Sequence, residues 1–359
     1  MYQNQDNPIY FSIVSELQTT QNYSQSFQKC RNILQEIEKI TKSRVISYFS
    51  VFKPALGVID SDATFIEDLL RCKNQFKPLI LILNSPGGQA VAAEKILLVC
   101  QAYALVNKTP FYVIIPKSAK SAATIVALGA DKILMSKTAE LGATDPQIIA
   151  STALEKGQQM TEEETTEDNK KTKKIKQEKI FDNITNVFPA FQITKSIETL
   201  LEESSKFWKF NRGAYNQFLS RYGYDIYTMA KNELKLSEDI IQKILNKKKE
   251  QSKIDDDFIK AFNIFLEPEL TFSHNRQITL SDLKDTQLSK TGFIQDYVEF
   301  YKKQRLPEAQ VEQLDALLWE YYFRTNAHLE DEGNPVSKTI ESSTHRFHLT
   351  SKGQLGGIS

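Results

Sequence analysis

Three short apolar runs, separated by helix-like segments, constrain the fold of this chain most strongly. The runs are Pro78–Leu83, Phe111–Ile115 and Lys132–Met135. Their nearly continuous apolar character is typical of strands that are buried on both faces of a sheet. Residues 89–105 between the first two runs predict a helix that is apolar nearly all round, and residues 121–128 predict a helix of small residues. Strands that alternate with helices indicate βαβ units and a parallel sheet.

The flanking segments extend this α/β pattern. Apolar residues at helical spacing predict a helix over residues 24–42, and β-branched and aromatic residues predict a strand over residues 43–51. A further helix is expected over residues 59–72, where aspartates stand near its start. Helices dominate the second half, and the polar C-terminal residues suggest a short hairpin and a tail. The helices expected there cover residues 192–208, 214–234, 237–246, 255–266 and 307–324.

One hydrophilic segment, residues 155–179, separates the two halves. An acidic stretch precedes a lysine-rich stretch, and this composition predicts a long exposed loop or a solvated helix that is flexible. A segregated charge block is also able to bind a partner, but the solvated segment is the favoured interpretation. The charged residues are Glu162, Glu163, Glu164, Glu167, Asp168, Lys170, Lys171, Lys173, Lys174, Lys176 and Lys179.

Composition narrows the function classes. Lys and Arg number 45, as do Asp and Glu, and a balanced charge argues against a nucleic-acid-binding protein. Three widely spaced cysteines and four scattered histidines suggest neither a disulfide framework nor a metal site. The N-terminus does not resemble a secretory signal, and no membrane-spanning helix is expected. We therefore expect a soluble cytoplasmic protein without metal or cofactor.

Two loops at the carboxyl ends of neighbouring predicted strands carry the chemistry. Gly87 and Gly88 follow one buried strand and precede a helix, while Ser121 begins another helix after the next strand. Glycines let a substrate carbonyl approach the backbone closely, and amides at a helix start stabilise an anion. A serine hydroxyl beside such amides is the equipment that acyl transfer needs. Separately these features are usually a turn and an N-cap, so their joint placement carries the prediction.

The motifs around these loops resemble a known family. Residues 83–94 (LNSPGGQAVAAE) resemble the oxyanion-loop segment of the signal peptide peptidase A-like serine peptidases. Residues 116–131 and 140–147 are most similar to one branch, the serine dehydrogenase proteinase family of the ClpP/crotonase superfamily. The resemblance is good over residues 40–150 and weaker over residues 270–278, which look like that family's closing histidine-containing segment.

This resemblance implies an α/β fold with a ClpP/crotonase-like repeated ββα spiral core, a mostly parallel sheet and helical C-terminal additions. Residues 1–42 would form an N-terminal polar segment and helix, and residues 43–150 the catalytic core. Residues 151–185 would be a charged flexible insertion, residues 186–290 the helical completion of the core, and residues 291–359 a C-terminal helical extension and tail.

The resemblance also carries over site residues. It makes Ser121 the nucleophile and assigns the oxyanion hole to Gly87, Gly88 and the Ala122 amide. Many relatives have Ser-Gly-Gly where this chain has Ser121-Ala122-Ala123. Alanine still supplies the amide, so the oxyanion hole is retained, although the helix entry is less permissive.

The general base is less clearly marked. Relatives of the signal peptide peptidase A type pair the serine with a lysine, and Lys195 stands at the head of the helix after the charged segment, where that lysine falls. Lys120 is adjacent to Ser121, but neighbouring side chains diverge. His274 is either a base or, as we favour, a structural histidine. Asp145 either orients a base or, as we favour, caps its loop. Glu140 is expected to form a salt bridge within its loop.

A Clp-like Ser-His-Asp triad is not supported, because the segment where its histidine would stand is Thr144-Asp145-Pro146 and contains no histidine. The leading hypothesis is a serine peptidase that cleaves peptide or protein substrates through an acyl-enzyme. The alternatives are a non-catalytic oligomeric scaffold of the same fold and a crotonase-type acyl-CoA enzyme, which the glycine loop and serine disfavour. By analogy with this fold we expect a homo-oligomer, and a membrane-associated partner is left open.

Overall fold

The structure is a computed structural model. It describes residues 13, 15–16, 23–53, 56–72, 76–167, 170–207, 212–251, 254–266, 276–331, 336–350 and 355–358. The chain divides into two units. The first comprises residues 1–146 and 233–359, and the second comprises residues 147–232.

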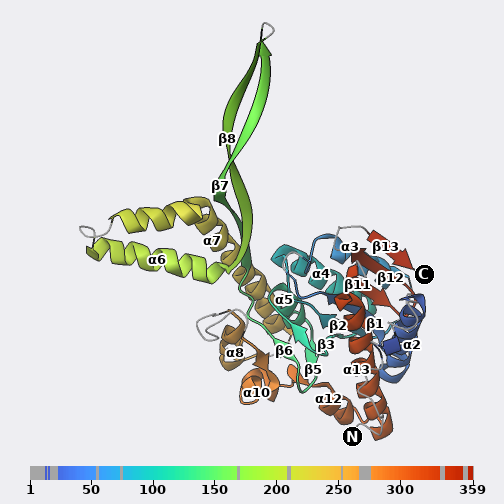
Figure 1. Cartoon of the computed structure of the whole chain (residues 1–359). Coiled ribbons are helices and arrows are strands. Elements are labelled where there is room, and N and C mark those ends of the chain that lie inside the picture. The colour runs from blue at the N-terminus through green and yellow to red at the C-terminus, as the bar shows by residue number, and fades with distance from the viewer. Residues whose placement is uncertain are drawn as a thin grey trace. The chain divides into compact units, whose positions relative to one another are not determined.

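The first unit is built on an eight-stranded, mostly parallel sheet (Figure 1). Five strands run parallel: β10 (Ile294–Asp296), β5 (Lys132–Met135), β3 (Phe111–Ile115), β2 (Leu79–Asn84) and β1 (Arg44–Ser50). Three more continue the sheet from β1 in antiparallel order: β11 (Val336–Ser342), β12 (Arg346–Thr350) and β13 (Leu355–Ile358). The predicted parallel strands are confirmed, and the C-terminal hairpin proves to be part of the main sheet.

Helices cover both faces of this sheet. Besides the part of α7 (Arg212–Gln251) from residue 233 onward, the helices of the first unit are α2 (Tyr23–Thr41), α3 (Ser61–Arg71), α4 (Ala90–Asn107), α5 (Ala122–Leu128), α8 (Asp256–Leu266), α10 (Leu280–Leu283), α11 (Gln287–Lys290), α12 (Tyr297–Lys303) and α13 (Glu308–Glu330). Successive residues of a strand point to opposite faces, so Leu81 packs with α4 and α5 while Ile82 packs with α2 and α13. Burial on both faces is the reason that these strands are continuously apolar.

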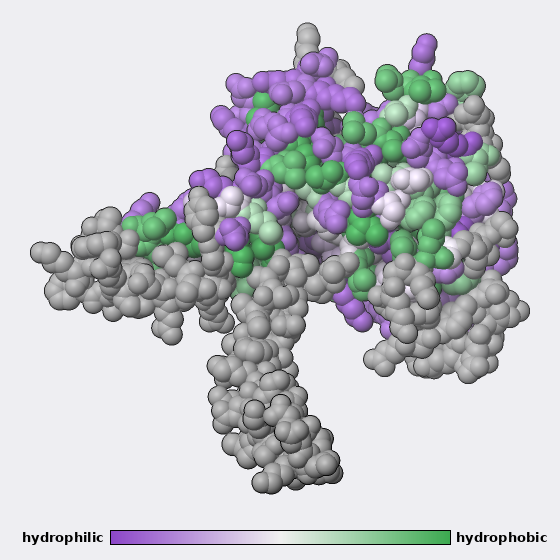
Figure 2. Space-filling model, turned by 90° about the horizontal axis from the view of Figure 1, so that it is seen from above, coloured by the Kyte–Doolittle hydropathy of each residue, from purple (hydrophilic) through white to green (hydrophobic). Residues whose placement is uncertain are grey.

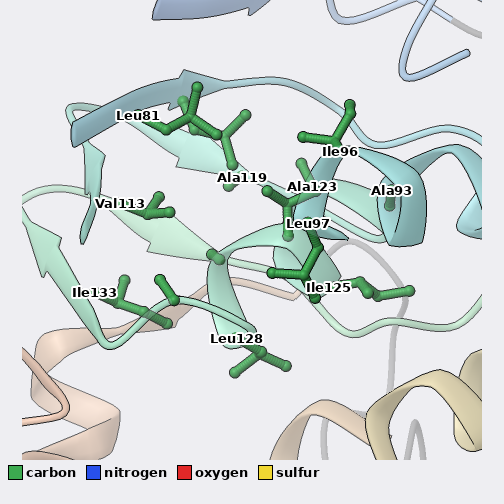
Figure 3. Close-up of a cluster of buried hydrophobic side chains, with 14 of the residues drawn as sticks. Leu81, Ala93, Ile96, Leu97, Val113, Ala119, Ala123, Ile125, Leu128 and Ile133 are labelled. Carbon is green, nitrogen blue, oxygen red and sulfur yellow. The ribbon is translucent and has the colours of Figure 1, made fainter. Parts of the chain in front are cut away.

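Helix α5 is buried completely, and this burial fixes the start of the helix. Every residue from Ala122 to Leu128 is buried. Figure 3 shows Ala123 and Ile125 of α5 gathered with Ile96 and Leu97 of α4 and with strand residues of the sheet. At the end of α5 a Cβ on Gly129 would stand 2.3 Å from the Leu97 side chain, so the two helices are in close contact.

Helix α4 combines a buried face with exposed apolar side chains. The face seen in Figure 2 carries apolar patches among hydrophilic residues. Helix α4 contributes Val91, Leu98, Leu105 and Val106 to the exposed apolar residues. Among the described helices, α4 is the one long and apolar enough to cross a membrane by length and composition, although the sequence led us to expect none. This is weak evidence for a membrane span, because 44% of the helix is buried and the core helices of soluble proteins meet the same criterion.

The second unit corrects the interpretation of the charged segment. Residues 155–179 were expected to be a loop or a solvated helix, but β7 (Gln147–Glu167) and β8 (Lys170–Pro189) form an antiparallel two-stranded sheet. Its register places Glu163 opposite Lys174 and Glu164 opposite Lys173. The acidic and basic stretches are therefore the two paired strands of one hairpin.

Two helices follow the hairpin, α6 (Ala190–Phe207) and α7 (Arg212–Gln251). The sequence analysis expected separate helices over residues 214–234 and 237–246, and this division is wrong because α7 is continuous. The residues at the expected break, Lys235 and Leu236, are good helix formers, and neither glycine nor proline interrupts them.

Candidate active site

Ser121 lies at the start of α5, in an uncommon backbone conformation. Its φ is 49° and its ψ is −122°, a combination that residues other than glycine rarely adopt. The Ser121 N–H donates to the Ala143 carbonyl at 3.1 Å, and the Ser121 carbonyl accepts from the Ile125 N–H at 3.2 Å. Hydrogen bonds on both sides therefore hold the residue in this conformation.

The Ser121 side chain does not act as an ordinary N-cap. It is 7% exposed, and it makes no capping hydrogen bond to α5. Within the part of the chain that the structure describes, its hydroxyl has no hydrogen-bond partner at all. The hydroxyl oxygen nevertheless retains some solvent-accessible surface, so it is able to meet a ligand.

The loop that follows β2 is joined to the segment that precedes Ser121. The Ser85 N–H donates to the Ser118 carbonyl, and the Lys120 N–H donates to the Ser85 carbonyl, both at 3.0 Å. Ser118 and Ala119 form the short strand β4 (Ser118–Ala119), which pairs with β6 (Glu140–Leu141) and, through it, with β9 (Ile278–Thr279). The sequence predicted loops at β4 and β6, because two-residue strands leave no periodic pattern.

Gly87 contacts the nucleophile position directly. A Cβ added at Gly87 would stand 2.6 Å from the Ser121 Cβ and 3.0 Å from the Ala122 nitrogen. The φ of Gly87 is +105°, so both the space and the backbone require glycine here. The structure thus brings together the two loops that the sequence placed at the same sheet edge.

The three predicted oxyanion-hole amides differ in their hydrogen bonding. The Gly87 N–H donates to the Ser85 hydroxyl at 3.2 Å. The amides of Gly88 and Ala122 donate to no acceptor among the described residues. Gly88 is held by its neighbours, because the Val58 N–H donates to the Gly87 carbonyl at 2.6 Å and the Gln89 N–H donates to the Val58 carbonyl at 2.9 Å. Two of the three amides therefore have no protein acceptor among the described residues.

Ser85 was not singled out from the sequence, although it lies inside the glycine motif. Its side chain is buried, and its oxygen accepts hydrogen bonds from the Gly87 N–H and from the Ser50 hydroxyl at 2.9 Å. We expect Ser85→Ala to lower the free energy of unfolding by about 1–3 kcal/mol, because it leaves two buried donors unpaired.

The same substitution is expected to lower kcat/KM about tenfold or more, because Gly87 touches Ser121 and loses its anchor. Peptide-cleavage kinetics and chemical denaturation measure the two effects. Ser136→Ala is the matched control, since it removes a buried serine hydrogen bond to Pro116 away from the glycine loop. Equal kcat/KM values in the two variants would contradict a positioning role for Ser85.

Lys120 and Glu140 form an ion pair beside the nucleophile. The Lys120 Nζ lies 2.9 Å from Glu140 Oε1, and the two side chains are 14% and 15% exposed. The contact lacks the angle of a hydrogen bond, whereas the Ser118 hydroxyl donates to the same oxygen at 2.9 Å. The salt-bridge role expected for Glu140 is confirmed. Whether Lys120 also acts as a base stays a prediction.

The remaining candidates stand at different places in the chain. Thr144 is fixed to α8, because its N–H and its hydroxyl both donate to the Phe265 carbonyl at 2.9 Å, and the adjacent Asp145 is 4% exposed. His274 lies outside the described residues. Lys195 is an exposed residue of α6 in the second unit, and its role as the base stays a prediction. Among the described residues no group of three or more His, Cys, Asp or Glu side chains could hold a metal ion.

Comparison with known proteins gives one family and two relatives. The model of the family described as ClpP-like SDH-type serine proteinase matches residues 9–188, half of the chain. An uncharacterized protein of Methanocaldococcus jannaschii is 35% identical over 123 residues, which cover 32% of this chain and 41% of the relative. A second uncharacterized protein of that organism is 38% identical over 87 residues, which cover 24% of this chain and 29% of the relative. The chain thus matches less than half the length of either relative.

Proposed function

Because the chain belongs to the family of ClpP-like SDH-type serine proteinases, we propose that it hydrolyses peptide bonds through an acyl-enzyme on Ser121. The family implies the ClpP/crotonase fold, and a mixed α/β unit with a large, mostly parallel sheet agrees with it. The observation that carries the proposal is the contact between Gly87 and Ser121, whose hydroxyl is unpaired among the described residues.

In the proposed reaction the Ser121 oxygen attacks the carbonyl carbon of the scissile bond, and its proton passes to a base. The carbonyl oxygen becomes an oxyanion, for which the Gly88 and Ala122 amides are the available donors, with Gly87 beside them. The amine leaves with a proton, and an ester to Ser121 remains. Water then attacks the ester, releases the acid and returns the proton to Ser121.

This proposal is tested with an active-serine probe such as a fluorophosphonate. We expect the probe to form one adduct, which mass spectrometry of the digested protein locates at Ser121. Labelling should remove peptide cleavage in proportion to the fraction of protein that is labelled. Cleavage that persists after complete labelling, or an adduct at another serine, would contradict the proposal.

For the base we propose Lys195. It follows residue 188, the last residue that the family model matches, so its support is the resemblance of the segment around it. A neutral lysine amine is able to accept the serine proton, whereas arginine keeps its proton in proteins. We therefore expect Lys195→Met and Lys195→Arg each to lower kcat by about 10²-fold or more. Peptide-cleavage kinetics measure the loss.

Lys231→Met serves as the control, because Lys231 is another exposed lysine of the second unit. His274→Ala should be measured in parallel, since His274 is the alternative base. A large loss in His274→Ala with full activity in both Lys195 variants would transfer the role to the histidine.

A further inference from the structure

A cavity of about 400 Å³ lies next to the segment that is hydrogen-bonded to Ser121. The Ser121 N–H donates to the Ala143 carbonyl, and the residues that follow, Thr144 and Asp145, line the cavity. Ser237 of α7 and Asn263 of α8 contribute to its other walls. All the residues that line it belong to the first unit. Its size falls in the range of about 300–1,000 Å³ that is usual for ligand pockets.

The lining of this cavity is acidic. It contains the carboxyl groups of Asp145 and Glu238, and none of its residues is a lysine or an arginine. Asp145 is 4% exposed, whereas Glu238 is exposed on α7. The amides of Gln242 and Asn263 add further carbonyl acceptors. A cation is the ligand that such a set of acceptors favours.

A second observation points to a ligand at the same place. The Ser237 side chain lines the cavity, the residue is 4% exposed, and its hydroxyl has no hydrogen-bond partner in the part of the chain described by the structure. A serine inside a helix usually bonds back to its own helix or faces solvent. A buried hydroxyl that does neither retains an unused acceptor and an unused donor beside the cavity.

We propose that this cavity receives the side chain of a lysine or arginine in the substrate, at the residue whose carbonyl Ser121 attacks. The inference rests on the proposed peptidase function and adds the substrate class. A lysine or arginine side chain has an apolar stem and a cationic head. Leu234 and Leu266 are partly buried in the lining and suit the stem, while Asp145, Glu238 and the Ser237 hydroxyl suit the head.

The test compares peptides that differ only in charge at this residue. One pair carries lysine or norleucine, and the other carries arginine or citrulline. We expect kcat/KM to be at least about tenfold higher for the cationic member of each pair, since hydrogen bonds to charged groups contribute more than neutral ones. Equal or faster cleavage of the neutral or apolar member would overturn the inference.

Charge-neutralising variants then assign the preference to the cavity. Asp145→Asn and Glu238→Gln should each reduce the difference in kcat/KM between the cationic and the neutral peptide. Because Glu238 is exposed, its substitution is not expected to disturb folding, unlike a substitution at the buried Asp145. Asp239→Asn is the matched control, because Asp239 is a neighbouring acid of α7 that pairs with Lys243 and does not line the cavity. A preference for lysine that survives in both cavity variants would also overturn the inference.

Binding by the full-length Ser121→Ala protein separates this inference from the proposed function. Fluorescence anisotropy should show about tenfold tighter binding of the lysine peptide than of the norleucine peptide, a difference lost in Ser121→Ala/Glu238→Gln. Lysine-dependent binding without cleavage by the unmodified chain would uphold the cavity and reject the hydrolysis. Cleavage that depends on Ser121 but not on lysine would uphold the hydrolysis and reject the cavity.

Discussion

Ser121→Ala is expected to abolish labelling by an active-serine probe and to lower kcat/KM for peptide cleavage by about 10⁴-fold or more. The substitution removes the attacking oxygen, whereas the amides around it continue to bind the substrate carbonyl. Loss of the nucleophile in serine peptidases therefore leaves only a small residual rate. Single-turnover and steady-state kinetics with one peptide measure the loss.

The same variant should fold as well as the unmodified chain. Alanine keeps the Cβ at a φ of 49°, so the backbone strain is the same in both proteins, and the hydroxyl that is lost has no hydrogen-bond partner among the described residues. We expect a change of less than about 0.5–1 kcal/mol in the free energy of unfolding. Cleavage at the unmodified rate by a well-folded Ser121→Ala protein would reject the peptidase mechanism.

Gly87→Ala is expected to have the second-largest effect on activity, a loss of about 10²–10³-fold in kcat. Its new Cβ would stand 2.6 Å from the Ser121 Cβ and 2.7 Å from the Lys120 carbonyl oxygen, so the loop or the nucleophile has to shift. Alanine also disfavours a φ of +105°. Together the strain and the contacts should lower the free energy of unfolding by about 1–3 kcal/mol.

Gly292→Ala separates these two causes. Gly292 also has a positive φ, +69°, but the nearest atom to its new Cβ would be 3.4 Å away, at the amide of Gln295. This variant should be destabilised by its backbone and yet retain cleavage. If both variants lose activity in proportion to stability, the contact between Gly87 and Ser121 has no catalytic meaning.

The sequence predicted those parts of the fold that depend on local pattern. The apolar runs of β2, β3 and β5 identify buried parallel strands, because their composition reflects helices on both faces. The pairing of β11 with β1 and the hairpin of β7 and β8 have no such local signal, because β11, β7 and β8 each have a polar or mixed composition. The pairing becomes visible only when the two strands are aligned, whether their residues lie far apart in the chain, as Ile46 and Ser342 do, or close together, as Glu163 and Lys174 do.

The candidate site was predicted to a similar extent. The rule that parallel strands end at one sheet edge was enough to bring Gly87 and Ser121 together. This rule was not enough to show that the Ser85 hydroxyl accepts a hydrogen bond from the Gly87 N–H, or that Ser121 has a positive φ. Both features depend on hydrogen bonds that the local sequence pattern does not reveal. The Asn-Ser-Pro-Gly-Gly motif contains Ser85, so a small polar residue ahead of two glycines is the signal that could have pointed to it.

The uncommon backbone angles of Ser121 depend on a contact between separate loops, because the Ala143 carbonyl that accepts from the Ser121 N–H lies in the loop after β6. An unfolded or partly folded chain lacks this contact, so Ser121 relaxes there to an ordinary conformation. Under the proposed function, labelling of Ser121 by an active-serine probe should therefore report the fraction of molecules in which this contact is formed.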